Sequence, residues 1–296
     1  MELYAPQEFN KAKLLGVFEN GSPEWHEARL SGIGGSEIGT IMGLNPWESA
    51  FTLWHKRAGL IETEPLTSMA VRLGNKLETP VLEIFAEEHP GFEVYTTGTY
   101  QSVSTKYLQA NPDGLAKTES GEWVIVEVKT SRNYWDEVPP AYVAQVQHYM
   151  NVMGLKTGVI AALVGMDYKE YWIERDQFAI DNQELYAREF WDGLRNGIVP
   201  SWDGSESTFE TVRKLHPLID DTEVEIDGGH YLVLAQEKLD QATAEFMEAK
   251  SRVMSLMGNA KHAYVTHDGQ QFRIASRQAR GMSAPYLVVN KKGIKN

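Results

Sequence analysis

One short segment restricts the fold of this chain more than any other. Residues 123–129 (WVIVEVK) form a run rich in Val and Ile that is typical of a strand. Because successive side chains on a strand point to opposite faces, Glu127 and Lys129 lie on one face, and Val126 and Val128 on the other. Burying the two charged side chains is costly unless they pair or the carboxylate holds a cation. The segment therefore predicts a sheet with a charged site, the alternative being a strand with a polar edge.

The apolar pattern around this strand predicts helices and further strands. The longest early helix, at 69–88, carries Leu73, Leu77, Leu82 and Phe85 at near-helical spacing. Other helices are predicted at 23–29, 36–43, 49–57, 141–153 and 181–196, and other strands at 92–100, 157–164 and 168–174.

The helix at 181–196 is expected to turn Leu185, Phe190 and Leu194 inward. Helices flanking a central mixed sheet make residues 1–215 an α/β (α+β) domain. Residues 216–296 are interpreted as a smaller module with a helix at 230–257 and a hairpin at 263–274, which turns at Asp268-Gly269.

Charge is distributed unevenly along the chain. The net charge is −13, but residues 250–296 hold nine Lys or Arg against one acid, Asp268. This segment carries +8 and leaves −21 on residues 1–249. A basic arm on an acidic body favours an acidic partner such as DNA, the alternative being a solvated surface without a partner. Acidic proteins can process DNA where carboxylates hold divalent cations, because the ions reverse the local field.

Composition excludes several classes of function. There is no cysteine, which removes disulfides, thiol nucleophiles, thiolate zinc sites and Cys-ligated iron–sulfur clusters. No run of apolar residues is long enough to span a membrane, and residues 1–15 lack the pattern of a secretory signal. A cytoplasmic location is therefore expected.

A second acidic residue precedes the central strand. Asp113 lies in a turn, Asn111-Pro112-Asp113-Gly114, from which it can approach Glu127. Two converging carboxylates suit a hard cation such as Mg²⁺, with water and phosphate oxygens completing the shell. Lys129 beside them could orient or help deprotonate an attacking water. The alternative is a surface Asp in an ordinary turn.

Further motifs surround these residues in a definite order. They are Trp25-His26, Arg29, Gly35-Ser36-Glu37, Gly74 with Glu78, Asp113, Glu127 with Lys129, and Gln145 with Tyr149. The ordered set resembles the PD-(D/E)XK nuclease superfamily and, more closely, the phage lambda exonuclease and YqaJ-type viral recombinase family. The resemblance spans roughly residues 22–195 and implies a restriction-endonuclease-like core.

The resemblance also implies a role for each matching residue. Asp113, Glu127 and the backbone carbonyl of Val128 would bind metal, with Glu78 helping to hold a second ion directly or through water. Lys129 would position and activate the nucleophilic water, Gln145 would orient the water or Lys129, and Tyr149 would support the helix.

Arg29 and Ser36 match the positions that bind a terminal 5′-phosphate in that family. A planar guanidinium suits phosphate, and the start of a helix after glycines offers N–H donors. Trp135 follows the central strand in a loop, where it could stack on a nucleotide. The alternative is that Trp135 packs within the protein.

By this resemblance the chain is expected to be a metal-dependent exonuclease. It would degrade one strand of linear duplex DNA 5′→3′ with two Mg²⁺ ions, for which Mn²⁺ would substitute, and leave a 3′ overhang. A phage single-strand annealing protein and a homotrimer around DNA ends are implied partners, in a bacterial host cell. The alternatives are an endonuclease or RecB-type nuclease of the same fold, and a non-catalytic DNA-binding protein.

Overall fold

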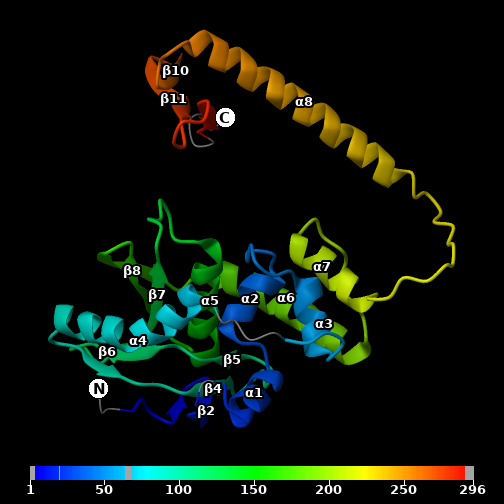
Figure 1. The fold of residues 1–296 in the computed structure, drawn as a ribbon. Coiled ribbons are helices and arrows are strands. Elements are labelled where there is room, and N and C mark those ends of the chain that lie inside the picture. The colour runs from blue at the N-terminus through cyan, green and yellow to red at the C-terminus, as the bar shows by residue number, and fades with distance from the viewer. Residues whose placement is uncertain (1–3, 20, 64–67, 291–296) are drawn as a thin grey trace. The chain divides into compact units, whose positions relative to one another are not determined.

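The computed structural model describes residues 4–19, 21–63 and 68–290, which Figure 1 traces from blue to red. The chain divides into two compact units, Met1–Ile219 and Asp220–Asn296. The boundary predicted at residue 215 lies a few residues before this division. Within the described residues, no helix combines the length and apolar character needed to cross a bilayer.

The first unit is built on a mixed sheet of five strands in the order β3-β6-β7-β8-β9. Their bounds are β3 (Glu93–Tyr95), β6 (Gly114–Lys117), β7 (Trp123–Ser131), β8 (Thr157–Val164) and β9 (Asp167–Glu174). β7 and β8 are parallel and the other neighbouring pairs are antiparallel. Helix α5 (Pro140–Met153) supplies the crossover that a parallel pair requires. The predicted mixed sheet flanked by helices is confirmed.

The two faces of β7 contact different apolar clusters. Val126 and Val128 pack in an apolar cluster with Leu82 and Phe85 of helix α4 (Met69–Glu88). Ile125 belongs to the second cluster, which includes residues of α5. Because the faces alternate, Glu127 and Lys129 point toward the α5 side, as the sequence pattern predicts.

Helix α4 has the predicted bounds but not the full predicted stripe. Ser68 caps it, and its buried residues are Val81, Leu82 and Phe85. Leu73, which shares the helical spacing of Leu82 and Phe85, is 48% exposed. The helix buries apolar side chains only in its second half, where it lies over the sheet.

Helix α6 (Gln177–Asn196) also differs in its inward face. Phe190 is buried and Leu194 is partly buried as predicted, but Leu185 is 46% exposed. The buried stripe instead runs through Ile180 and Ala187. The helix begins before the predicted start, and its first turn includes Ile180, which fixes the side that faces inward.

The strand predicted at 92–100 is two strands in different sheets. Its first part is β3, and its second part begins β4 (Thr99–Ser102) of a four-stranded sheet in the order β1-β2-β4-β5. The other members are β1 (Glu8–Phe9), β2 (Ala12–Gly16) and β5 (Gln109–Ala110). A Cβ at Gly98 would lie 2.5 Å from the Gly16 carbonyl oxygen, so this close backbone approach requires glycine.

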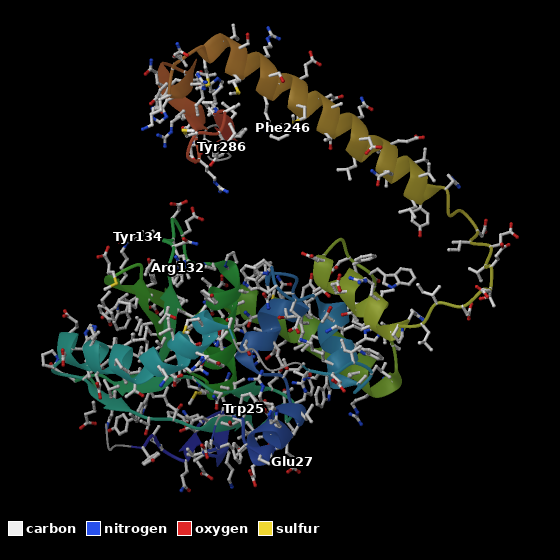
Figure 2. The ribbon with its side chains drawn as sticks, in the orientation of Figure 1. Trp25, Glu27, Arg132, Tyr134, Phe246 and Tyr286 are labelled. Atoms are coloured by element: carbon white, nitrogen blue, oxygen red, sulfur yellow. The ribbon has the colours of Figure 1, made fainter. Side chains whose placement is uncertain are left out.

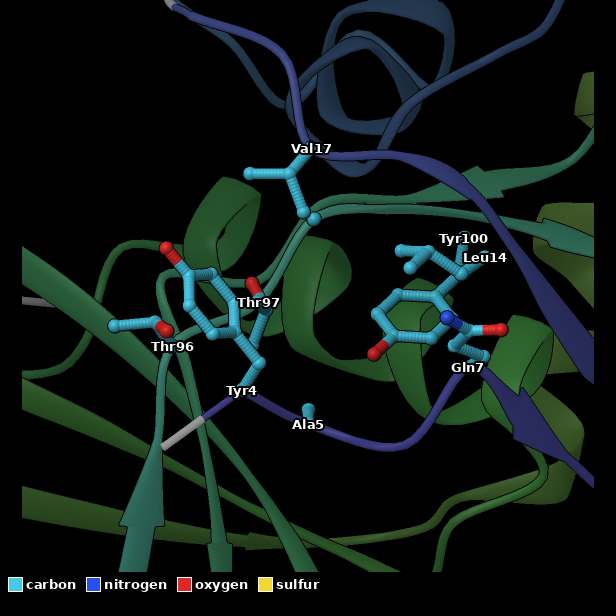
Figure 3. A pocket seen from close by; sticks show the side chains of 9 residues that line it. Tyr4, Ala5, Gln7, Leu14, Val17, Thr96, Thr97 and Tyr100 are labelled. Atoms are coloured by element: carbon cyan, nitrogen blue, oxygen red, sulfur yellow. The ribbon is translucent and has the colours of Figure 1, made fainter. Parts of the chain in front are cut away.

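A pocket of about 180 Å³ lies beside this second sheet (Figure 3). Its lining includes Tyr4, Leu14, Thr97 and Tyr100. It shares no residue with the set of predicted catalytic side chains.

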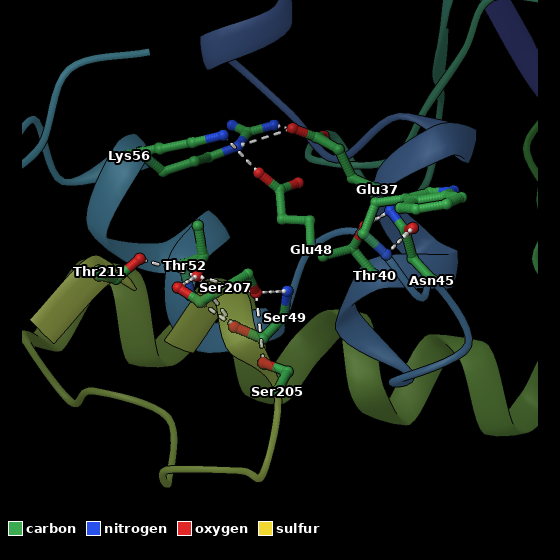
Figure 4. A network of polar contacts seen from close by, with 12 residues as sticks. Glu37, Thr40, Asn45, Glu48, Ser49, Thr52, Lys56, Ser205, Ser207 and Thr211 are labelled. Atoms are coloured by element: carbon green, nitrogen blue, oxygen red, sulfur yellow. Dashed lines mark hydrogen bonds and ion pairs between the residues drawn. The ribbon is translucent and has the colours of Figure 1, made fainter. Parts of the chain in front are cut away.

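Four further helices belong to the first unit. They are α1 (Pro23–Leu30), α2 (Gly35–Ile41), α3 (Ala50–Arg57) and α7 (Glu206–Leu215). The sequence pattern did not predict α7, whose attachment to α3 is made by hydroxyl groups (Figure 4). Thr52 Oγ1 lies 2.9 Å from Thr211 Oγ1, and Ser207 Oγ accepts the Ser49 N–H at 2.9 Å.

The second unit consists of helix α8 (Tyr231–Met257) and a three-stranded antiparallel sheet. Its strands are β10 (His262–His267), β11 (Gln270–Gln278) and β12 (Tyr286–Val289). The predicted hairpin turn is confirmed, with positive φ at both Asp268 and Gly269. β12 was not predicted, and the basic residues Lys291, Lys292 and Lys295 lie outside the described residues.

Candidate active site

The pairing of β6 with β7 brings Asp113 beside Glu127. Gly114 is paired with Val126, so Asp113, the residue before β6, lies next to the charged part of β7. Its Oδ2 accepts the backbone N–H of Val128 at 2.7 Å. The turn and the strand therefore converge as the sequence predicts, and the side chain of Asp113 is oriented by the backbone.

Glu127 lies at the centre of the site and is 2% exposed. Its Oε1 accepts hydrogen bonds from Lys129 Nζ and, at 2.6 Å, from Gln145 Nε2. Its Oε2 is buried and has no hydrogen-bond partner among the described residues. A buried carboxylate oxygen without a partner is costly, and a bound cation would remove that cost.

The acidic groups of the site hold their protons more tightly than usual. Burial, followed by repulsion from Asp113, raises the pKa of Glu127 to about 8 against the pull of Lys129. Burial and Asp113 likewise raise the pKa of Glu78 on α4 to about 7. Burial also raises the pKa of Asp113. Burial is the main cause of each shift, so the site disfavours ionised carboxyls unless a cation compensates their charge.

Lys129 favours its charged form in this setting. Burial would lower the pKa of its ammonium, but Glu127 and Asp113 more than offset this, and the pKa is raised. The Nζ also lies 5.0 Å from the ring centroid of Tyr142. The arrangement suits a lysine that orients a water or an anionic oxygen better than one that removes a proton.

The Tyr142 ring that contacts Lys129 belongs to a small aromatic cluster. Half-buried Trp135 has its ring 5.6 Å from Tyr142 and 5.9 Å from Tyr171, centroid to centroid. Trp135 therefore packs against the residue that contacts Lys129, and stacking on a nucleotide stays a prediction. Sequence reasoning missed Tyr142, although it precedes Gln145 by three residues, a spacing that places both on one face of α5.

Gln145 and Tyr149 lie one turn apart on α5. Gln145 Nε2, besides contacting Glu127, donates to the Tyr149 hydroxyl at 2.9 Å. A Cβ at Gly35 would lie 2.4 Å from Cε1 of Tyr149, so only glycine allows the start of α2 to approach α5 this closely. The small-residue turn is thereby adjacent to the acidic site.

Arg29 and Ser36 lie together beside that turn. Arg29 Nη2 is 3.5 Å from Ser36 Oγ, and its guanidinium lies 4.7 Å from the ring of Trp25, labelled in Figure 2. Arg29 also acts electrostatically on Tyr149, partly opposing the burial that raises the pKa of the tyrosine hydroxyl. The two predicted phosphate ligands are thus brought together and placed near α5.

The helix start beside Ser36 is less open than expected. Glu37 Oε2 accepts the Gly34 N–H at 3.0 Å, so one of the expected free donors is already capped. Arg57 in turn binds Glu37, with Nη2–Oε2 at 2.6 Å and Nε–Oε1 at 3.1 Å. Arg57 also donates to the carbonyls of Gly32 and Leu30, which fixes the turn between α1 and α2.

The donor set fits a hard divalent cation. The described residues hold no cluster of three or more His, Asp or Glu side chains close enough to bind an ion by themselves. Asp113 and the unpartnered oxygen of Glu127 are oxygen donors, which would suit Mg²⁺ or Mn²⁺ with water in the remaining positions, and a metal-binding role of the Val128 carbonyl stays a prediction. Glu78 acts on the site through its charge.

The fold places the chain in a structural class. Its structure is similar to that of an alkaline exonuclease from Laribacter hongkongensis, with a TM-score of 0.50 and 22% identity over 66% of this chain and 100% of that one. The same enzyme in complex with dAMP matches with a TM-score of 0.50 and 22% identity, covering 60% of this chain and 94% of that one. The chain therefore shares the fold of this enzyme.

Sequence comparison then gives the family. The model of the YqaJ-like viral recombinase domain matches residues 24–158. The uncharacterized protein YqaJ of Bacillus subtilis is 30% identical over 265 residues, which is 83% of this chain and 82% of that protein. The chain therefore belongs to the YqaJ-like viral recombinase family. Protein D345L of African swine fever virus is 26% identical over 154 residues, 43% of this chain and 44% of that protein.

Proposed function

We propose that this chain is a metal-dependent nuclease that degrades one strand of linear duplex DNA in the 5′→3′ direction and leaves a 3′ overhang. One observation carries the proposal. Asp113, Glu127 and Lys129 converge at one position on β7, where a buried oxygen of Glu127 has no partner among the described residues. The family membership and the exonuclease fold support the same chemistry.

The proposed cofactor is Mg²⁺, as two ions, with Mn²⁺ as a substitute. Asp113, Glu127 and the Val128 carbonyl would hold the first ion, and Glu78 would help to hold the second. When bound, such ions generate a nucleophilic hydroxide from water and neutralise charge on the phosphate and the leaving 3′-oxygen.

The side chains around the carboxylates have positioning roles in this proposal. Lys129 keeps its proton and would hold the attacking water or a phosphate oxygen in line with the scissile bond. Gln145 binds Glu127 Oε1 and so fixes the carboxylate in the orientation that leaves Oε2 without a hydrogen-bond partner, where it would bind the metal ion. Tyr149 accepts a hydrogen bond from Gln145 and keeps α5 in place.

Polarity would arise from Arg29 and Ser36. The guanidinium and hydroxyl lie together beside the start of α2, where they would bind the 5′-terminal phosphate of the strand being degraded. Anchoring that phosphate at a fixed distance from the carboxylates directs hydrolysis to the bond near the 5′ end.

The proposal extends to the cellular setting. An exonuclease of this kind would supply 3′ overhangs to a phage-type single-strand annealing protein. It would act in the cytoplasm of a bacterial host, as a protein of phage or prophage origin. A ring-shaped trimer around the duplex would make digestion processive.

Digestion of end-labelled linear duplex tests the proposal. We expect rapid loss of a 5′ label with Mg²⁺, slow loss of a 3′ label, and near-complete inactivity of Lys129→Ala. Lys13→Ala removes an exposed lysine on β2 and serves as the matched control. Cutting of a covalently closed circle would favour an endonuclease instead, and intact duplex at every mildly alkaline pH would favour a non-catalytic protein.

A further inference from the structure

Helix α8 leaves its apolar side chains uncovered. Its own unit, Asp220–Asn296, buries none of the described residues of this helix, although it is 27 residues long. Leu232, Leu239, Phe246 and Leu256 are between 51% and 81% exposed. Figure 2 labels Phe246 on this helix. A helix with so many exposed large apolar groups is typical of one that packs against a partner.

The exposed residues follow a strict heptad. Leu232, Leu239, Phe246 and Val253 recur every seven residues and occupy the a position. The d position holds Ala235, Ala242, Ala249 and Leu256. Apolar residues at both positions over nearly four heptads are the pattern of a coiled-coil seam.

We propose that α8 pairs with α8 of a second copy of this chain, in the antiparallel direction. An antiparallel coiled coil places each a residue opposite a d residue. Leu239 then lies opposite Ala242 of the second copy. The same register sets Phe246 opposite Ala235 and Leu232 opposite Ala249 of that copy, so every layer combines one large and one small side chain.

Parallel pairing would fill the seam less well. In the parallel direction each residue meets its own copy, so Ala242 would face Ala242 and Phe246 would face Phe246. Layers of two alanines leave space between the helices, and layers of two phenylalanines crowd it. A parallel pair would bring Glu245 near Lys250 of the second copy, but one attractive contact does not offset this mismatch in volume.

Charge selects the register among antiparallel arrangements. With Leu239 opposite Ala242, the flanking g positions bring Lys238 beside Glu245 of the second copy, and two-fold symmetry makes this contact twice. A shift by one heptad would instead place Glu245 beside Glu245 and Lys238 beside Arg252, both repulsive.

The proposed register uses only the part of α8 that its own sheet leaves free. The paired segment runs over residues 232–249, about 27 Å of helix. The end of α8 makes contacts with β10, and Val253, Met254 and Met257 are partly covered there. The seam and the intramolecular contact therefore occupy different stretches of one helix.

The mass of the full-length protein tests whether the pairing exists. We expect Leu239→Glu to lower the mass measured by sedimentation equilibrium, because it removes the contact through which α8 joins a second copy of the chain. Leu234→Glu replaces an exposed leucine outside the seam and should leave the mass unchanged. Equal masses for wild type and Leu239→Glu, with unchanged circular dichroism, would overturn the proposal.

Charge exchange and cross-linking test the direction and register. Lys238→Glu and Glu245→Lys should each weaken association about tenfold, and the double variant should restore it. The chain has no cysteine, so introduced thiols report cleanly. Oxidation should join Leu239→Cys to Ala242→Cys in a mixture of the two variants. Cross-linking of Ala242→Cys to itself alone, or no cross-linking in the mixture, would overturn the antiparallel register.

Discussion

Metal affinity should depend steeply on pH because the central carboxyl resists ionisation. The pKa of Glu127 is raised to about 8, so the group is about 1% ionised at pH 6 and mostly ionised at pH 8.5. A metal ion must displace the proton to bind. Protonation of this group alone should therefore make the apparent affinity for Mg²⁺ at pH 6 about 100-fold lower than the affinity of the fully ionised site. This factor is equivalent to about 2.7 kcal/mol.

The same shift fixes how stability without metal changes with pH. The pKa of Glu127 in the folded state lies above the ordinary value of 4.5 for a free glutamate, so the protonated carboxyl favours the folded state. That contribution is fully present below pH 4.5 and is lost as pH rises through about 8. Added Mg²⁺ should therefore increase the free energy of unfolding most at alkaline pH, where the contribution of the protonated carboxyl has been lost.

Thermal unfolding with and without Mg²⁺ measures both effects. We expect the increase in melting temperature on adding Mg²⁺ to be large at pH 8.5 and small at pH 6, because ligand binding stabilises in proportion to the logarithm of affinity. Glu127→Gln should show little increase at either pH. An increase in the wild type that is equal at the two pH values, or larger at pH 6, would refute this reasoning.

Three other substitutions give sharp expectations. Gly35→Ala pushes a methyl group into the ring of Tyr149 and should lower the free energy of unfolding by about 1–3 kcal/mol, measured by urea denaturation. Arg57→Met leaves the largely buried carboxylate of Glu37 without its charge partner and should cost about 3–5 kcal/mol in the same assay, whereas a cost below 1 kcal/mol would mean that the turn does not depend on this pair. Trp135→Ala should lower kcat by loosening the aromatic group behind Lys129; a rise in KM alone would instead indicate contact with the nucleotide.

Much of the central site could be predicted because its residues are close in the sequence. Alternation on one strand is enough to put Glu127 and Lys129 on the same face, and the turn before β6 is short enough to bring Asp113 beside them. The bounds of α4 follow from periodicity and from the Ser68 cap. These features depend on local geometry, which the sequence expresses directly.

Other features depend on contacts between distant segments. The pattern of residues 92–100 is that of one strand, and only the close approach of Gly16 to Gly98 shows where the chain passes between two sheets. The Arg57–Glu37 pair joins two helices whose proximity no local pattern encodes. Helix α7 is held by hydroxyl contacts such as Thr52–Thr211, and polar contacts leave no apolar period to detect.

Helix α5 touches both halves of the proposed machinery. Gln145 binds the proposed catalytic carboxylate of Glu127, and Tyr149 packs against Gly35 at the start of α2, beside the proposed phosphate ligands. If Arg29 and Ser36 hold the terminal phosphate, α5 fixes the distance between that phosphate and the phosphodiester bond that is cut. The position of α5, rather than the chemistry of hydrolysis, would then set the length of each released product. A shift of α5 relative to α2 or β7 would change that length.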